Sequence, residues 1–276
     1  MLSSHPILRR RGTRIGLGRS IAVTLALLCA SAVAADYVAI DGGPFTSVLP
    51  QGPLPEASAA VQIAGFSLRK TPVTAREFQA FVKVHPEWRR SEVPAVFADQ
   101  SYLIDWGSAT DLVDQEAVDR PVVNVSWFAA RAFCESENAR LPTWLEWEYA
   151  AAADAERRDA RADPLWRRRI LAWYERPTEA RLPAVGGAAN AYGVSDLHGL
   201  VWEWVEDFNA LFIAGDSRTQ GDPDTLKFCG AGAISIIDRD SYAVVMRIAL
   251  LSSLDAATTT SSLGFRCARS LEEKLP

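Results

Sequence analysis

The sequence predicts an α+β domain that is rich in loops and has few regular strands. Two capping-box patterns, which begin at Thr74 and Thr143, predict helices in the first half of the chain. After Pro183 the chain consists of short apolar pieces separated by Gly, Asn, Asp and Ser, which are typical turn residues. Nine tryptophans supply large apolar side chains that can hold such irregular segments against a core.

Residues 1–34 have the pattern of a signal peptide. Five arginines between residues 9 and 19 precede the apolar run 21–33, which is too short for a membrane-spanning helix. Small residues at Ala32 and Ala34 form a cleavage site, so we expect cleavage after Ala34. An uncleaved anchor is the alternative. The expected location is therefore the periplasm or the extracellular space.

The remaining residues, 35–276, are long enough for one domain with a sizeable core. Removal of five arginines and no acids changes the formal charge from -5 to -10. An acidic surface without a basic patch argues against binding to nucleic acid or to an anionic membrane. No second long apolar run follows residue 34, so we expect no integral membrane segment after cleavage.

Local patterns predict the elements in the first half of this domain. Residues 36–48 are expected to form a strand, a turn and the start of a second strand. A helix is expected after Thr74, and a second after Ser126 with Phe133 and Cys134 facing inward. A third helix is expected from Thr143 to about Arg158, with Glu146 as its capping-box carboxylate.

The second half gives weaker signals. Arg167, Arg168 and Arg169 are expected on a solvated helix face, and no regular helix is indicated after Pro183. Alternation in residues 201–205 places Trp202 and Trp204 on one face of a strand and Glu203 on the other. Both tryptophans are expected in the core, because large aromatic side chains dominate burial.

Five segments in this order carry a specific resemblance. They are residues 70–81, 120–134, 140–150, 192–204 and 263–269, with Arg-Leu-Pro-Thr-Trp-Leu-Glu-Trp-Glu-Tyr-Ala in the third and Leu-Gly-Phe-Arg-Cys-Ala-Arg in the last. Together they resemble the sulfatase-modifying-factor family, which includes the formylglycine-generating enzymes. The resemblance covers nearly all of residues 35–276. It implies a loop-rich fold related to C-type lectins.

The resemblance also implies metal ions, and the sequence departs from it at their ligands. Relatives hold calcium with asparagine side chains, backbone carbonyls and a glutamate, which corresponds to Glu203 here. Leu200 stands where the usual asparagine precedes that glutamate, and a hard cation requires oxygen ligands. Calcium at Glu203 therefore stays a candidate with a reduced ligand set.

Copper is the second implied metal. Formylglycine-generating enzymes bind copper(I) through two cysteines near the C-terminus, and soft thiolates suit that metal. Here Ser241 and Tyr242 match the start of the pattern, but Ala243 and Ile248 replace the two cysteines. We therefore expect no copper-dependent formation of formylglycine.

Three cysteines follow residue 34, at positions 134, 229 and 267. The resemblance implies a disulfide between Cys134 and Cys267. Cys229 would then be left, either as a reactive thiol at a cleft or as a small buried apolar residue. Arg247 matches an arginine of the copper pattern, so Cys229 and Arg247 are the candidate catalytic residues. His85 and His198 are interpreted as structural, because neither has an identifiable acid-base partner.

Three functions from different classes remain open. The leading hypothesis is an exported maturation or accessory factor, with an oxidoreductase activity on a periplasmic protein or a small metabolite. Its models are the pyoverdine-maturation and nitrite-reductase-linked members of the family. A non-catalytic, lectin-like recognition module is the second hypothesis. A formylglycine-generating oxidase with relocated ligands is the third.

Overall fold

The computed structural model describes residues 36–49, 59–174, 181–211 and 242–271. All of the described residues belong to one compact unit, residues 35–276. Among the described residues, no helix is both long enough and apolar enough to cross a membrane.

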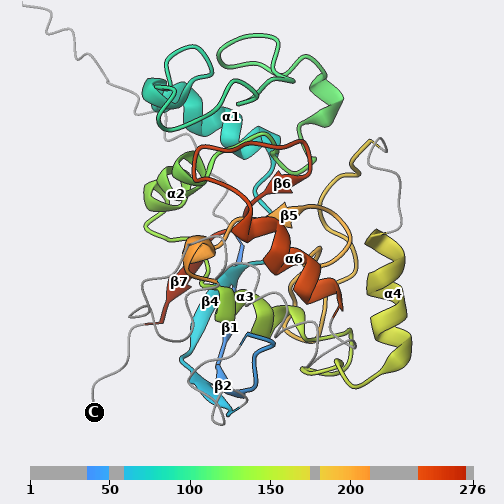
Figure 1. Cartoon of the computed structure of the whole chain (residues 1–276). Helices are drawn as coiled ribbons and strands as arrows, with labels where there is room; N and C mark the ends of the chain where they lie inside the picture. The colour runs from blue at the N-terminus through green and yellow to red at the C-terminus, as the bar shows by residue number, and fades with distance from the viewer. Residues whose placement is uncertain (1–35, 50–58, 175–180, 212–241, 272–276) are drawn as a thin grey trace, which may run out of the picture. The chain divides into compact units, whose positions relative to one another are not determined.

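The strands of the described residues form three small sheets, as expected for a domain with few regular strands. β1 (Tyr37–Ile40) and β7 (Ala268–Ser270) both pair antiparallel with the central strand β4 (Phe66–Arg69) (Figure 1). β2 (Gly43–Phe45) pairs antiparallel with β3 (Val61–Ile63), and β5 (Trp202–Glu203) pairs parallel with β6 (Leu263–Gly264). The last strands of the chain therefore complete sheets begun by distant segments.

The three predicted helix starts are confirmed. α1 (Ala75–Val84) and α3 (Trp144–Ala151) begin with complete capping boxes, in which Thr74 pairs with Glu77 and Thr143 with Glu146. α2 (Trp127–Ser136) begins at the N-cap Ser126, whose hydroxyl accepts a hydrogen bond from the Ala129 N–H. Each cap satisfies backbone N–H groups that the first helical turn leaves without partners.

Two predictions about helices are wrong. α3 ends at Ala151 rather than near residue 158, because Asp154 accepts hydrogen bonds from the Glu156 and Arg157 N–H groups and turns the chain. A regular helix, α6 (Tyr242–Ser252), also lies after Pro183. α4 (Pro164–Tyr174) carries the predicted solvated face, on which Arg168 and Arg169 are exposed.

The remaining helices are single 3-10 turns in the loops. They are η2 (Pro86–Trp88), η3 (Gln115–Ala117) and η4 (Phe208–Ala210).

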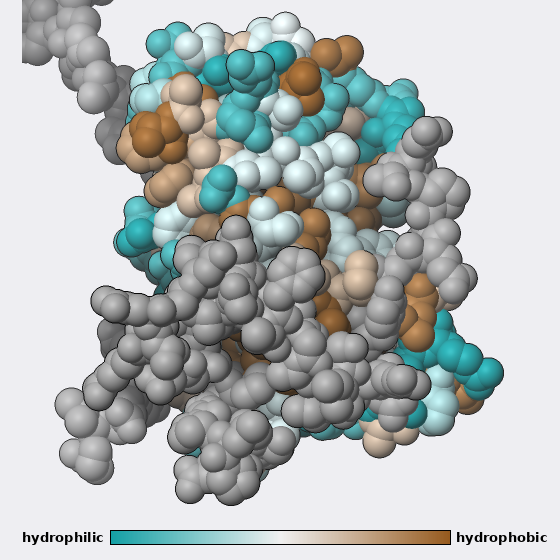
Figure 2. All heavy atoms as spheres, in the orientation of Figure 1, coloured by the Kyte–Doolittle hydropathy of each residue, from teal (hydrophilic) through white to brown (hydrophobic). Residues whose placement is uncertain are grey.

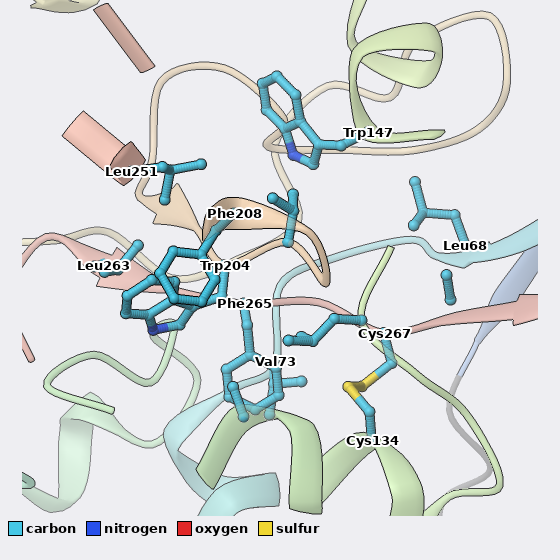
Figure 3. Close-up of a cluster of buried hydrophobic side chains, with 14 of the residues drawn as sticks. Leu68, Val73, Cys134, Trp147, Trp204, Phe208, Leu251, Leu263, Phe265 and Cys267 are labelled. Carbon is cyan, nitrogen blue, oxygen red and sulfur yellow. A yellow bond between two sulfur atoms is a disulfide. The ribbon is translucent and has the colours of Figure 1, made fainter. Parts of the chain in front are cut away.

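One hydrophobic core joins α1, α2 and α3 to the small sheets, and Figure 3 shows part of it. Cys134 of α2 and Cys267 beside β7 belong to this core and form a disulfide, with a Cα–Cα distance of 5.5 Å and both residues fully buried. The bond joins the pair that the family resemblance implies. It closes a loop across 133 residues.

Apolar residues on the viewed face form separate brown patches among hydrophilic teal ones (Figure 2). The large exposed apolar side chains include Val84, Val96, Val113 and Leu165, which come from different segments. Scattered residues of this kind are normal for a protein surface and do not define a binding face. A concave site is therefore the stronger candidate for function.

Candidate functional site

A groove of about 970 Å³ runs between the loops after α1 and the segments around β5 and β6. A concave, mostly apolar site with a few polar groups is the usual form of a binding site for a small ligand or a peptide segment. Its lining residues are Ala75, residues 103–106, residues 112–114, Ala117, residues 120–124, Trp173, residues 181–183, residues 199–200, Trp202 and residues 261–262.

Hydrogen-bonded backbone segments lie side by side in the wall of this groove. The Asn124 N–H donates to the Thr260 carbonyl at 2.9 Å, and the Trp202 N–H donates to the Ser262 carbonyl at 2.8 Å. The backbone at Gly264 also lies close to the segment that contains Val122, because a Cβ atom on residue 264 would be 2.5 Å from the Val122 carbonyl oxygen. The segments can pack this tightly because residue 264 has no side chain.

Two residues of the groove have left-handed backbone conformations. Leu103 has φ 47° and Asn124 has φ 55°. Asparagine tolerates this region, but a leucine there is strained by about 1–3 kcal/mol. The Leu103 N–H donates to the Asn124 carbonyl at 2.9 Å, and the Asn124 amide Nδ2 donates to Asp105 Oδ2 at 2.9 Å. The surrounding packing thus holds Asp105 and Asn124 in one fixed arrangement.

Asp114 holds the other charged groups of the groove. Its carboxylate forms ion pairs with Arg120, at 3.6 Å, and with Arg181. Arg181 is mostly exposed, so water screens its pair and the stabilisation is small. The two arginines nevertheless neutralise the charge of Asp114.

Behind the groove lies a fully buried ion pair between Glu203 and Arg266. The guanidinium donates from Nη2 to Glu203 Oε1 and from Nε to Oε2, both at 2.8 Å. The Trp147 indole N–H adds a third hydrogen bond to Oε2, also at 2.8 Å. Neither charged side chain has any exposed surface, so each depends on the opposite charge of the other to offset the cost of its desolvation.

β5 connects this ion pair to the groove. Its two residues point in opposite directions, so Trp202 lines the groove while Glu203 enters the core. Trp204 is fully buried, as predicted, but Trp202 is only half-buried and contacts Trp173 of α4 with ring centroids 5.5 Å apart. The prediction that both tryptophans belong to the core is therefore correct for Trp204 and incomplete for Trp202.

The carboxylate of Glu203 does not fit the calcium hypothesis. Its charge is balanced by Arg266, and its two oxygens already accept three hydrogen bonds. Within the described ranges, no group of three or more His, Cys, Asp or Glu side chains is arranged to hold a metal ion. A hard cation needs oxygen ligands, and the two oxygens of Glu203 are already directed at N–H donors.

The positions assigned to the copper cysteines are filled by packed apolar side chains. Ala243 of α6 belongs to a small cluster with Ala160 and with Trp166 and Ile170 of α4. Ile248, five residues further along α6, is fully buried in the main core. Neither side chain has a donor atom, so these residues do not fit copper.

Arg247 lies between these two environments and does not line the groove. Its guanidinium carbon is 3.6 Å from the centroid of the Trp147 ring, and Nη2 donates to the backbone carbonyl of Glu203. The side chain is almost fully buried. These contacts give Arg247 a structural role, and the catalytic role stays a prediction. Cys229, the other predicted catalytic residue, lies outside the described residues.

Both predicted structural histidines have structural contacts. His198 lies between the rings of Trp147 and Trp166, and its Nε2 donates to the Ala151 carbonyl at 2.8 Å. Burial lowers the pKa of His198 to about 4, so the imidazole is neutral at neutral pH. His85 ends α1, and its ring packs against Phe81.

Sequence reasoning did not identify Asp105 and Asn124 as site residues. The sequence offered one weak signal, an asparagine between two β-branched residues, since asparagine favours left-handed positions. Asp105 carried no signal, because its contact with Asn124 depends on folding.

The described residues define a loop-rich α+β domain with a concave, mostly apolar groove. The family model described as "Sulfatase-modifying factor enzyme 1-like domain" matches residues 28–271. The chain therefore belongs to the sulfatase-modifying-factor family, as its sequence segments predicted.

Relatives and a solved structure show how far the similarity extends. The formylglycine-generating enzyme of Streptomyces coelicolor is 33% identical over 188 residues, which are 59% of this chain and 56% of that protein. The hercynine oxygenase of Mycolicibacterium smegmatis is 34% identical over 199 residues, 62% of this chain and 45% of that protein. The match thus spans about half of the length of these relatives. The structure of PvdO from Pseudomonas aeruginosa covers 85% of this chain and 94% of its own at 17% identity, with a TM-score of 0.45.

Proposed function

We propose that this chain is an exported maturation or accessory factor, which binds a partner protein or a small metabolite in the groove. The observation that carries this proposal is the groove itself, to which three of the segments that carry the family resemblance, residues 70–81, 120–134 and 192–204, contribute part of the lining. The relatives are named as a formylglycine-generating enzyme and an oxygenase, which supports an oxidative reaction on the bound molecule. Export is supported by the signal-peptide pattern and by the buried disulfide, a bond typical of oxidising compartments.

The chemistry differs from that of a copper enzyme with two thiolate ligands. Of the three cysteines after residue 34, two form the disulfide, so only Cys229 can supply a thiolate. A single cysteine cannot provide a pair of soft ligands. We therefore disfavour the formylglycine-generating activity as a function of this chain.

A non-catalytic recognition module is the second candidate. The described lining residues include neither His nor Cys, and their titratable groups are Asp105, Asp114, Arg120 and Arg181. A groove with this composition can bind and orient a ligand, but its walls offer few groups for nucleophilic or acid-base catalysis.

Replacing Trp202 in the groove wall should separate these possibilities. We expect Trp202→Ala to weaken ligand binding by about tenfold or more, because buried tryptophans often dominate binding energy. The control is Phe97→Ala, which removes an exposed aromatic ring outside the groove. The measurement is depletion of small molecules and peptides from an extract of the protein's own compartment, followed by mass spectrometry of bound and released species.

The products decide between the two candidates. A new product released by the wild-type chain and not by Trp202→Ala would support a maturation enzyme. Binding without any product would overturn the enzymatic part of the proposal and favour the recognition module. Equal binding by wild type and Trp202→Ala would show that the groove is not the binding site.

A further inference from the structure

The outer face of α4 lines a second concave surface, apart from the groove beside Trp202. This surface, which we call the α4 groove, encloses about 660 Å³ between α4 and the turn formed by residues 154–157. Its lining residues are Asp154, Ala155, Glu156, Arg157, Asp163, Leu165, Arg168, Arg169 and Ala172. They all lie between the third and the fourth of the segments that carry the family resemblance, so those segments do not account for the α4 groove.

α4 presents different side chains to the core and to the α4 groove. Trp166 and Ile170, four residues apart, are buried in a small apolar cluster. The side chains that line the α4 groove follow i, i+3, i+4 and i+7 spacing, so they share another face of the helix. All of them are exposed, and α4 lies at one side of the domain (Figure 1); they are Leu165, Arg168, Arg169 and Ala172.

Ion pairs and hydrogen bonds hold the two walls of the α4 groove together. Arg157 of the turn forms ion pairs with both Asp154 and Asp163, the second at 2.7 Å. Asp154 also accepts a hydrogen bond from the Glu156 N–H at 3.0 Å, and Asp163 accepts one from the Leu165 N–H at 2.7 Å at the start of α4. The turn is therefore fixed against the first residues of α4 before any ligand binds.

Arg168 and Arg169 provide positive charge that these pairs do not use. Among the residues that the structure describes, neither guanidinium has an ion-pair partner. Glu156 is exposed in the opposite wall and offsets one of the two charges. Residues 154–169 contain six arginines and four acidic residues, a net charge of +2, whereas residues 35–276 carry -10. This local surplus attracts a negatively charged group to the α4 groove.

α4 also forms part of the wall of the groove beside Trp202. Trp173 of α4 lines that groove and contacts the Trp202 ring. Arg169 precedes Trp173 by four residues, about 6 Å along the helix axis, and Leu165 precedes it by eight, about 12 Å. About four extended residues of a polypeptide cover the longer distance. A protein partner can thus contact both surfaces at once, with α4 between them.

We propose that the α4 groove binds an acidic segment of a partner protein, with its carboxylates on Arg168 and Arg169 and an apolar side chain against Leu165. A guanidinium donates two parallel hydrogen bonds to a carboxylate, which are stronger than hydrogen bonds between neutral groups. Leu165 is 63% exposed and supplies the apolar contact beside these charges. This inference rests on the proposed function, because it selects a protein rather than a small metabolite as the partner of the maturation factor.

The test compares an acidic peptide with its neutral isostere. Isothermal titration at low ionic strength measures binding of acetyl-Glu-Glu-Leu-Glu-Glu-amide and of acetyl-Gln-Gln-Leu-Gln-Gln-amide. We expect the acidic peptide to bind wild type at least tenfold more tightly than the neutral one. About 0.5 M sodium chloride should remove most of this preference, because salt screens exposed charges. Vesicles of phosphatidylglycerol and phosphatidylcholine form a third probe, which presents negative charge on a membrane.

The variant Arg168→Gln/Arg169→Gln should reduce the preference for the acidic peptide to less than threefold. The control Arg76→Gln/Lys83→Gln removes the same charge from exposed side chains of α1 outside both grooves, and it should keep the preference. Leu165→Ala should weaken the binding of both peptides by a similar factor, because it removes the apolar contact and no charge. Circular dichroism verifies that the variants are folded.

Three results would overturn the inference. They are equal binding of the two peptides, no binding of the acidic peptide at millimolar concentration, and binding of the anionic vesicles without binding of the acidic peptide, which would indicate a membrane instead. If Trp202→Ala still weakens capture of material from the extract, the groove beside Trp202 remains the binding site and only the contact with α4 fails. If Trp202→Ala has no effect either, the proposed function fails as well.

Discussion

Replacing Glu203 by glutamine should lower the free energy of unfolding by about 3–5 kcal/mol. The carboxylate neutralises Arg266, and both side chains are fully buried. A glutamine would leave the guanidinium charged in the core and would turn an N–H₂ group toward its N–H donors. Removal of one partner of a buried pair costs far more than the pair contributes, because the remaining charge stays desolvated.

Urea unfolding at neutral pH, followed by tryptophan fluorescence, measures this loss. The matched control is Glu135→Gln, which breaks the exposed pair with Arg131 at the surface of α2 and should cost less than about 1 kcal/mol. A loss for Glu203→Gln as small as that of the control would contradict the buried ion pair. We also expect weaker ligand binding by Glu203→Gln, because β5 carries Trp202 beside Glu203.

The double variant Cys134→Ala/Cys267→Ala should lose about 4–5 kcal/mol of stability if the chain-entropy model holds. The bond closes a loop across 133 residues, so its removal gives the unfolded chain much more freedom. The control is Cys229→Ala, which removes a cysteine and keeps the disulfide. Addition of a reductant to wild type should reproduce the loss, and a double variant as stable as wild type would contradict the expectation.

Local hydrogen bonding explains why the helix starts could be predicted. A cap needs only a hydroxyl or carboxylate and the next few N–H groups, so Thr74, Ser126 and Thr143 carry the signal within four residues. The family segments similarly identified the fold, because large buried side chains such as Trp147, Trp204 and Phe265 fill its core.

Elements that depend on distant contacts were missed. α6 has the apolar residues Val244, Ile248 and Leu251 facing the core and further apolar residues on its other sides, so its sequence lacks a clear helical period. Asp105 and Asn124 are 19 residues apart and meet through a side-chain hydrogen bond beside two left-handed residues, Leu103 and Asn124, which no local pattern reveals. The partner of Glu203 lies 63 residues further along the chain, which no local pattern reveals.

We infer that this chain keeps the fold of its family without a copper site of two thiolates. The most direct measurement loads the purified, oxidised protein with copper(I) in competition with a chromophoric chelator, and then assays aldehyde formation on a cysteine peptide in the presence of oxygen. The formylglycine-generating enzyme of Streptomyces coelicolor serves as the positive control. We expect no tightly bound copper and no aldehyde product, whereas one tightly held copper per chain together with aldehyde formation would contradict the account.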